Sequence, residues 1–233
     1  MSARAAVASC VAGLALGLIS VSPAGAADEC TGLRVCLPVA GPWVVVPSAG
    51  VDYELACPLA GYIVAGIDAR VAAEDVDVSF RGETGSPVGP GVTTRRSVVF
   101  RAVRTRAGAP ATSFRPFIGC IPTSGGGGRA LTSVTARTAV IKPTQPLRSV
   151  VVTKPVRSRS LTVRAACPAG SRLIGSTHAV AFRRQLPPPA ALLGSVRVLR
   201  TVVEGVVVAR VTATPLAGAR AEVQVRALCA KAS

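Results

Sequence analysis

The 233-residue chain has little of the chemistry that enzymes use most often. It contains one histidine, and only 3% of its residues are aromatic. It has no G-x-S-x-G, H-E-x-x-H or phosphate-binding loop motif, and no paired-cysteine spacing typical of zinc sites. Acidic residues are also scarce, with 11 Asp and Glu against 27 Lys and Arg. These absences argue against the common hydrolases, nucleotide-binding enzymes and metalloenzymes, and no cofactor is predicted.

The remaining candidates for catalysis are isolated in the sequence. His178, in Ser176-Thr177-His178, is interpreted as an ordinary loop or strand-end residue. A hydrolase that uses only carboxylates stays open as an alternative, and its candidate residues are Asp68, Asp75, Asp77 and Glu83. No pattern places these side chains in one cleft, so a non-catalytic protein is the preferred interpretation.

The N-terminal segment has the pattern of a secretion signal. Arg4 gives a short basic start, residues 5–21 form an apolar run, and Ala24-Gly25-Ala26 supplies the small-residue pattern that signal peptidase reads. No second apolar segment is long enough to cross a bilayer. We therefore expect residues 1–27 to be removed from an exported, extracellular protein that is not anchored by a membrane helix.

A lipid anchor at Cys10 is the alternative for this segment. Val7-Ala8-Ser9-Cys10 resembles a lipobox, but most of the apolar run follows Cys10, whereas it should precede an acylated cysteine. Lipidation is therefore not favoured. Cys10 is expected to leave with the signal, and six of the seven cysteines remain.

Six cysteines in an exported chain predict disulfides, because that compartment is oxidising. Cys57 and Cys120 are 63 positions apart, and Cys167 and Cys229 are 62 apart. A near copy of the sequence around Cys57 recurs around Cys167, which predicts an internal repeat with one bridge in each copy. Two cysteines then remain for a small N-terminal clip, Cys30 with Cys36. Each long bridge closes about sixty residues and is worth roughly 4 kcal/mol on the chain-entropy model.

The repeat divides the mature chain into two homologous units. We predict a first domain at 28–124 that carries the N-terminal clip, a glycine linker at 125–128, and a second domain at 129–233. The tetraglycine linker is flexible by composition, so the two units are expected to be modular.

The hydrophobic pattern inside each unit has a period of two, which predicts strands. Val163, Ala165 and Cys167 alternate with polar residues, and the last strand of the second copy does the same before Cys229. In that strand the other parity is expected to face outward, and it comprises Glu222, Gln224, Arg226 and Leu228. The fold class is predicted to be all-β, with two tandem homologous antiparallel β-sandwich domains, each with one internal disulfide.

The cysteine separation resembles that of immunoglobulin domains. That family has a Trp after the first cysteine and a Tyr two residues before the second, whereas Trp43 precedes Cys57 and the two later positions hold Ile118 and Ala227. The resemblance therefore implies immunoglobulin-like architecture, and it does not imply membership of the family.

Charge is distributed unevenly. Residues 28–83 carry a net charge of −6, and residues 84–233 carry +21. Such a basic body predicts adsorption to anionic envelope polymers, with Arg183 and Arg184 as candidate binding residues. Codon bias that places arginine on solvated strand faces explains the same excess, and it is the preferred explanation. Specific nucleic-acid binding is not predicted, because no aromatic side chains are interleaved with the basic ones.

The acidic segment 74–83 raises the question of calcium. Asp75 and Asp77 are expected on one strand face, with Glu83 nearby, but Phe80 stands where an EF-hand loop requires glycine. A solvated strand face is the simpler interpretation, and no metal is predicted. The sequence as a whole predicts a secreted, disulfide-stabilised, non-catalytic protein that binds or decorates the cell envelope.

Overall fold

The computed structural model describes residues 30, 35–81, 96–122, 147–215 and 218–232. This part of the chain forms thirteen β-strands and one four-residue helix, so the all-β prediction is confirmed. The strands of the first half are β1 (Leu37–Ala40), β2 (Trp43–Val46), β3 (Val51–Ala56), β4 (Tyr62–Val71), β5 (Val76–Arg81), β6 (Ser97–Arg104) and β7 (Thr112–Pro122). Those of the second half are β8 (Arg148–Val156), β9 (Ser160–Ala166), β10 (Ser171–Arg183), β11 (Val196–Val203), β12 (Val206–Ala213) and β13 (Arg220–Lys231), with helix α1 (Ala190–Leu193) between β10 and β11.

Side-chain alternation explains why these segments become strands. In β9, Val163 and Ala165 are buried, whereas Thr162 and Arg164, which alternate with them, are exposed. Valine is common in the strands and fits a pleated, half-buried surface. The hairpin between β11 and β12 turns at Glu204 and Gly205, which both have positive φ angles of 49° and 76°. No helix in the described residues is long and apolar enough to cross a membrane.

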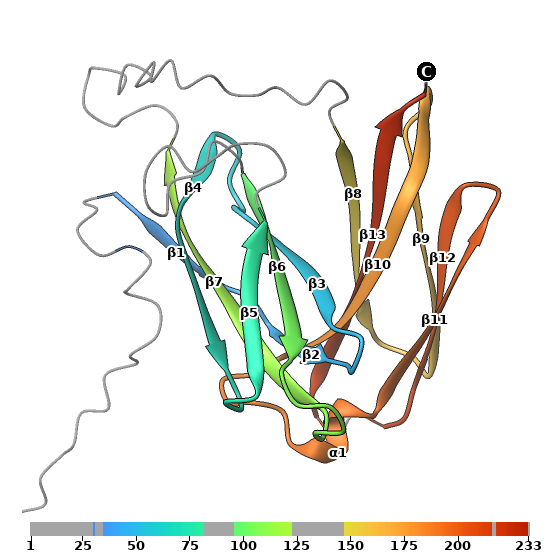
Figure 1. Cartoon of the computed structure of the whole chain (residues 1–233). Helices are drawn as coiled ribbons and strands as arrows, with labels where there is room; N and C mark the ends of the chain where they lie inside the picture. Colours follow the sequence, from blue (N-terminus) through green and yellow to red (C-terminus); the bar gives the residue numbers. More distant parts are fainter. Residues whose placement is uncertain (1–29, 31–34, 82–95, 123–146, 216–217, 233) are drawn as a thin grey trace, which may run out of the picture.

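The strands form three sheets, and every pairing is antiparallel. The largest sheet has seven strands in the order β1-β7-β2-β10-β13-β8, with β4 also paired to β7. The two smaller sheets have the orders β3-β6-β5 and β11-β12-β9. In Figure 1 the sheet β11-β12-β9 lies at the right of the molecule, beyond β10 and β13.

The two halves repeat the same strand pairing. The set β4-β7-β2 with β5-β6-β3 in the first half corresponds to β10-β13-β8 with β11-β12-β9 in the second. The pairing of β4 with β7 is shifted between Val64 and Gly66, and the pairing of β10 with β13 is shifted between Leu173 and Gly175. Both irregularities lie beside the second cysteine of their half, because Val64 pairs with Cys120 and Leu173 with Cys229.

Strand β2 joins the halves into one continuous sheet. Val44 pairs with Phe114 of β7 on one side and with Ala181 of β10 on the other. Trp43 pairs with Phe182, and its indole Nε1 donates a hydrogen bond to the carbonyl of Gln185 at 3.3 Å. The expected glycine linker at 125–128 and the signal segment at 1–27 both lie outside the described residues.

Two buried clusters lie on opposite faces of β10. Ala179 and Ala181 belong to the first cluster, with residues of β2 to β7, whereas Phe182 belongs to the second, with residues of β8 to β13. The rings of Phe100 and Phe114 pack against each other in the first cluster, with centroids 6.4 Å apart. The first core therefore includes residues of the second half.

The structure contains disulfides between Cys30 and Cys36, Cys57 and Cys120, and Cys167 and Cys229. The Cα atoms of the two long bridges are 5.9 and 5.7 Å apart, which is an ordinary separation for a disulfide. Each long bridge ties a small sheet to the large one, because it joins the end of β3 to β7 and the end of β9 to β13.

Candidate functional site

The face of β13 that was expected to point outward is buried. The sequence interpretation of this face is therefore wrong. Glu222, Gln224 and Arg226 are only 6%, 4% and 9% exposed, because β3 of the first half packs against them. The strand's alternation is still intact, since Val223 and Val225 face the second core. The period of two gives the two faces of a strand, but it does not say what covers the second face.

Gln224 binds the backbone of β3. The Glu54 N–H donates to Gln224 Oε1 at 2.7 Å, and Gln224 Nε2 donates to the Glu54 carbonyl at 2.9 Å. The Glu54 carboxylate accepts hydrogen bonds from Ser97 Oγ at 2.8 Å and Ser149 Oγ at 2.9 Å, and Arg226 Nε lies 3.3 Å from Glu54 Oε2. These contacts make a polar interface that holds the halves together.

Arg183, a predicted binding residue, belongs to the same interface. Its Nε donates to Glu222 Oε2 at 2.7 Å, and Tyr53 OH donates to Glu222 Oε1 at 3.0 Å. Burial and the neighbouring Glu222 carboxylate raise the pKa of Tyr53 far above its usual range, so the phenol stays protonated as a donor. Arg184 follows β10 and is half-buried. The structure thus gives Arg183 a role in folding, which the sequence did not suggest.

The predicted acidic candidates do not converge. Asp75 lies in the turn before β5 and not on the strand, so it does not share a strand face with the exposed Asp77. Asp68 is exposed on β4, and Glu83 lies outside the described residues. Asp75 does line a hollow of about 470 Å³ together with Glu74, Thr105 and Arg106. Among the residues that the structure describes, no group of three metal-ligating side chains comes together.

A groove runs between the two halves, along β10. Its polar end is a hollow of about 380 Å³ whose charged and hydrogen-bonding lining residues are Asp52, Arg101, Ser176, Thr177, His178 and Arg200. Its apolar end is a hollow of about 230 Å³ lined mainly by Val45, Ala111, Val180, Leu193, Val196 and Val198. Pro47, Val51 and His178 line both hollows, so we call the two together the junction groove.

The junction groove exists because β2 pairs with only a short part of β10. β2 pairs only with Ala181 and Phe182, so in the described residues no strand covers the same edge of β10 from Ser171 to Val180. The turn after β2 then forms one wall, and β11 forms the other. Arg200 of β11 donates a hydrogen bond to the Ser176 carbonyl.

Two polar atoms of the junction groove have no partner within the described part of the chain. They are His178 Nδ1 and Thr177 Oγ1, and both are buried. Burial lowers the pKa of His178, and the positive Arg200 lowers it further, so the imidazole is neutral at pH 7. Because Nδ1 makes no hydrogen bond to Asp52 or Ser176, the groove does not contain an assembled catalytic triad.

A second candidate surface is the outward face of the sheet β11-β12-β9. Arg210 of β12 pairs with Leu199 of β11 and with Thr162 of β9. Arg197 on β11 and Arg164 on β9 are therefore diagonal neighbours of Arg210 across the sheet. Diagonal neighbours in an antiparallel sheet are typically about 7–8 Å apart. We call these three exposed side chains, Arg164, Arg197 and Arg210, the arginine face.

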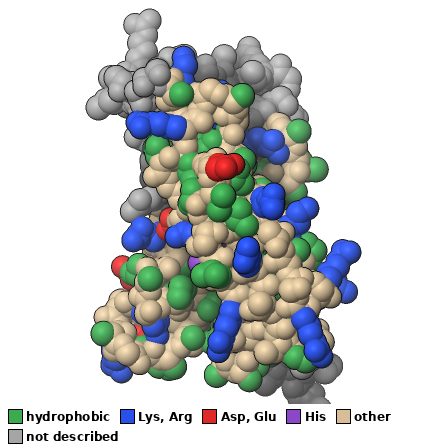
Figure 2. All heavy atoms as spheres, turned by 90° about the vertical axis from the view of Figure 1, so that its right-hand side faces the viewer, with side chains coloured by type: hydrophobic (Ala, Val, Ile, Leu, Met, Phe, Trp, Pro, Cys, Tyr) green, Lys and Arg blue, Asp and Glu red, His purple; other side chains and the backbone are tan. Residues whose placement is uncertain are grey.

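The residues around the arginine face are hydroxyl-bearing or aliphatic. Ser160, Thr162, Thr201 and Thr212 share its surface, and no outward residue of the three strands is acidic or aromatic. Figure 2 shows this side of the molecule, on which basic side chains far outnumber acidic ones. The sequence contained part of this signal, because each arginine has the polar parity of its strand. The cross-strand register that aligns them could not be read from the sequence.

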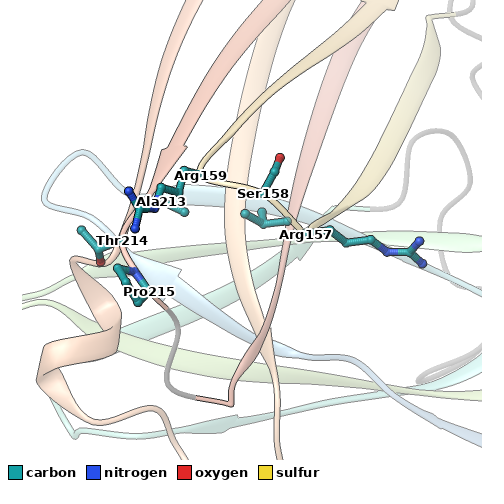
Figure 3. A pocket seen from close by; sticks show the side chains of 7 residues that line it. Arg157, Ser158, Arg159, Ala213, Thr214 and Pro215 are labelled. Carbon is teal, nitrogen blue, oxygen red and sulfur yellow. The ribbon is translucent and has the colours of Figure 1, made fainter.

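The arginine face ends at a hollow of about 300 Å³ beside the turn between β8 and β9. Its lining includes Arg157, Arg159 and Thr214. Figure 3 shows that Arg157 points away from the other labelled residues, whereas Arg159 lies beside Ala213. These arginines extend the basic surface beyond the row of Ser160 and Thr212.

Comparison with known proteins adds no assignment: no family model, no curated protein and no solved structure matches the chain.

Proposed function

We propose that this chain is an exported, non-catalytic protein of two tandem immunoglobulin-like β-sandwich domains that binds anionic polymers of the cell envelope. Three disulfides indicate an oxidising environment outside the cytoplasm. The identical strand pairing of the two halves supports two homologous sandwiches, which share an edge through β2. The observation that carries the binding function is the arginine face.

The arginine face suits an extended polyanion. Its three arginine side chains are exposed, lie on the same face of one sheet and have no carboxylate beside them on that face. Arginine binds phosphate and carboxylate with two parallel hydrogen bonds, and the nearby threonine hydroxyls can bind the backbone of a polyol or sugar chain. The missing aromatic side chains argue against recognition by ring stacking on sugars or bases.

The test is retention of the mature protein on purified anionic envelope polymer in a salt series. The variant Arg164→Gln/Arg197→Gln/Arg210→Gln is expected to lose retention at a lower salt concentration than the wild type, because exposed charges are screened beyond about 10 Å at 0.1 M ionic strength. The matched control is Arg106→Gln/Arg148→Gln/Arg172→Gln, which removes the same charge from exposed positions elsewhere. Equal losses would assign retention to net charge, and no retention by the wild type would refute the function.

A secreted hydrolase is the second candidate, and the junction groove is the observation that favours it. His178, Ser176 and Asp52 line one hollow, so a base, a nucleophile and an acid are close in space. Glu74 and Asp75 likewise share a hollow, as a carboxylate mechanism would require. Turnover of an ester or glycoside panel that is lost in His178→Ala or in Glu74→Gln/Asp75→Asn would support the hydrolase. We expect no turnover.

A further inference from the structure

The polar end of the junction groove has an uncompensated positive charge. Arg101 and Arg200 line it, and its single carboxylate, Asp52, lies 3.9 Å from Arg101 Nη1, which is a loose ion pair. Arg200 uses one N–H for the neutral Ser176 carbonyl, and its guanidinium carries further donors. His178 is the other titratable group there, and it is neutral. The excess charge favours an anionic ligand group.

Hydrogen-bonding groups that face no protein partner lie at the same place. Thr177 Oγ1 and His178 Nδ1 are both buried and unpartnered among the described residues. A buried polar atom without a partner costs about 1–3 kcal/mol, so such atoms are rare in folded proteins and call for an explanation. The two residues are neighbours on β10, so their side chains point to opposite faces of the strand. His178 lines both ends of the groove, so a ligand there would supply the hydrogen bond that His178 lacks.

The apolar end of the junction groove continues directly from this polar end. Apart from His178, its walls are aliphatic or proline side chains from both halves, and Leu193 and Val196 in them are buried. The hollow of about 230 Å³ is large enough for a short alkyl chain, and the groove as a whole falls in the size range of small-molecule sites, roughly 300–1,000 Å³. The groove therefore has one charged end and one apolar end.

We propose that the junction groove binds a small amphipathic carboxylate, with its carboxylate between Arg101 and Arg200 and its alkyl chain in the apolar end. The planar guanidinium groups match a carboxylate. His178 can add a hydrogen bond, since a neutral imidazole has one donor and one acceptor nitrogen. The site is independent of the arginine face, so either proposal can fail without the other.

The chain supplies its own reporters for this site. It has one histidine, which lines both ends of the groove, so its imidazole resonances report binding without assignment of other signals. Titration of the mature protein with octanoate is expected to shift them saturably. Octanol, which lacks the charge, and acetate, which lacks the chain, are expected to bind at least tenfold more weakly. Equal binding of either one, or no saturable shift with octanoate, would overturn the proposal.

Variants test the two ends separately. Arg200→Gln and Arg101→Gln are each expected to weaken octanoate binding about 10-fold or more, which is the range for hydrogen bonds to charged groups. Ala111→Leu, at an exposed position on the rim of the apolar end, is expected to weaken octanoate more than acetate. Arg172→Gln, on β10 but outside the groove, is the control and should bind like the wild type. A melting curve for each variant checks the fold, and an unchanged affinity in Arg200→Gln and Arg101→Gln would contradict the assigned carboxylate site.

Discussion

Glu222 is a carboxylate that the fold takes out of water, and its two partners come from different halves of the chain. Tyr53 of β3 and Arg183 of β10 each bind one of its oxygens, at 3.0 and 2.7 Å. A buried charge is tolerated when it is paired and hydrogen-bonded, and it becomes destabilising when one partner is removed. This residue therefore couples the charge of β13 to the position of β3.

Replacing Arg183 is expected to destabilise the protein. Arg183→Gln removes the ion pair and leaves the Glu222 carboxylate with its hydrogen bond from Tyr53. The free energy of unfolding should fall by about 1–2 kcal/mol, a modest value because the Arg183 side chain is 60% exposed. Adding Glu222→Gln should recover part of the loss, because the unpaired charge is then gone. Denaturant midpoints measure both effects, with Arg172→Gln as the control. A midpoint for Arg183→Gln equal to that control would show that the pair contributes nothing.

His178 gives the stability a pH dependence. Its pKa in the folded protein is lowered by burial and by Arg200, from an ordinary value of 6.5. The unfolded chain therefore takes up a proton below pH 6.5 that the folded chain does not, so the free energy of unfolding falls as the pH falls through this range. Urea midpoints at pH 7.5 and 5.5 should differ less in His178→Gln than in the wild type. Equal differences in the two proteins would refute this effect.

β3 is an edge strand, and the side chain of Gln224 binds the backbone on its unpaired edge. One neighbour, β6, pairs with it through the register of Val51 with Ala102 to Ala56 with Ser97. On the other edge, the Gln224 amide binds both the N–H and the carbonyl of Glu54. The amide thus takes the place of one residue of a neighbouring strand. This arrangement blocks further pairing at an edge that could otherwise recruit another chain.

Gln224→Leu tests this cap. The substitution buries the Glu54 N–H and carbonyl without partners, and the free energy of unfolding is expected to fall by about 1–3 kcal/mol. Thr153→Ala, which removes only the weaker 3.4 Å contact to Gln224 Nε2, should cost less than about 0.5 kcal/mol. Chemical denaturation of both variants decides the point. Equal costs would mean that the amide does not cap β3.

How much of this the sequence predicts depends on the range of the interaction. The strand character of β9 and β13 and the partners of Cys57 and Cys167 follow from local alternation and from the repeat. The burial of Glu222 does not follow, because it depends on β3, far away in the chain. The sequence does not reveal the junction groove for the same reason, since His178 and Asp52 line one hollow only after both halves have folded.

At the scale of the whole molecule, one sheet passes through both halves. β2 pairs with β7 and β10, and the first core includes Ala179 and Ala181 of β10. The polar interface around Glu54 adds side-chain contacts across the same junction. Two halves that share a sheet and a core face are expected to unfold together, in a single cooperative transition.

The expected transition distinguishes shared from separate domains. Calorimetry of the mature chain should give one peak whose calorimetric and van't Hoff enthalpies agree. Two resolved peaks would show that the contacts of β2 and of Gln224 do not couple the halves, and the chain would then behave as two independent modules joined at 125–128.

The second half alone provides the sharper measurement. Residues 129–233, expressed under oxidising conditions, keep their own core cluster except for Val45 and keep the bridge from Cys167 to Cys229, so the fragment is expected to fold. Its free energy of unfolding should be lower than that of the whole chain, because Ala179, Ala181 and the polar face of β13 become exposed to solvent without the first half. In this fragment Glu54 is absent, so Gln224→Leu should no longer cost about 1–3 kcal/mol and should be nearly neutral. If the substitution destabilises the fragment as much as the whole chain, Gln224 acts within the second half. If the fragment has no cooperative transition, its core depends on the first half, and the two repeats fold only as one unit.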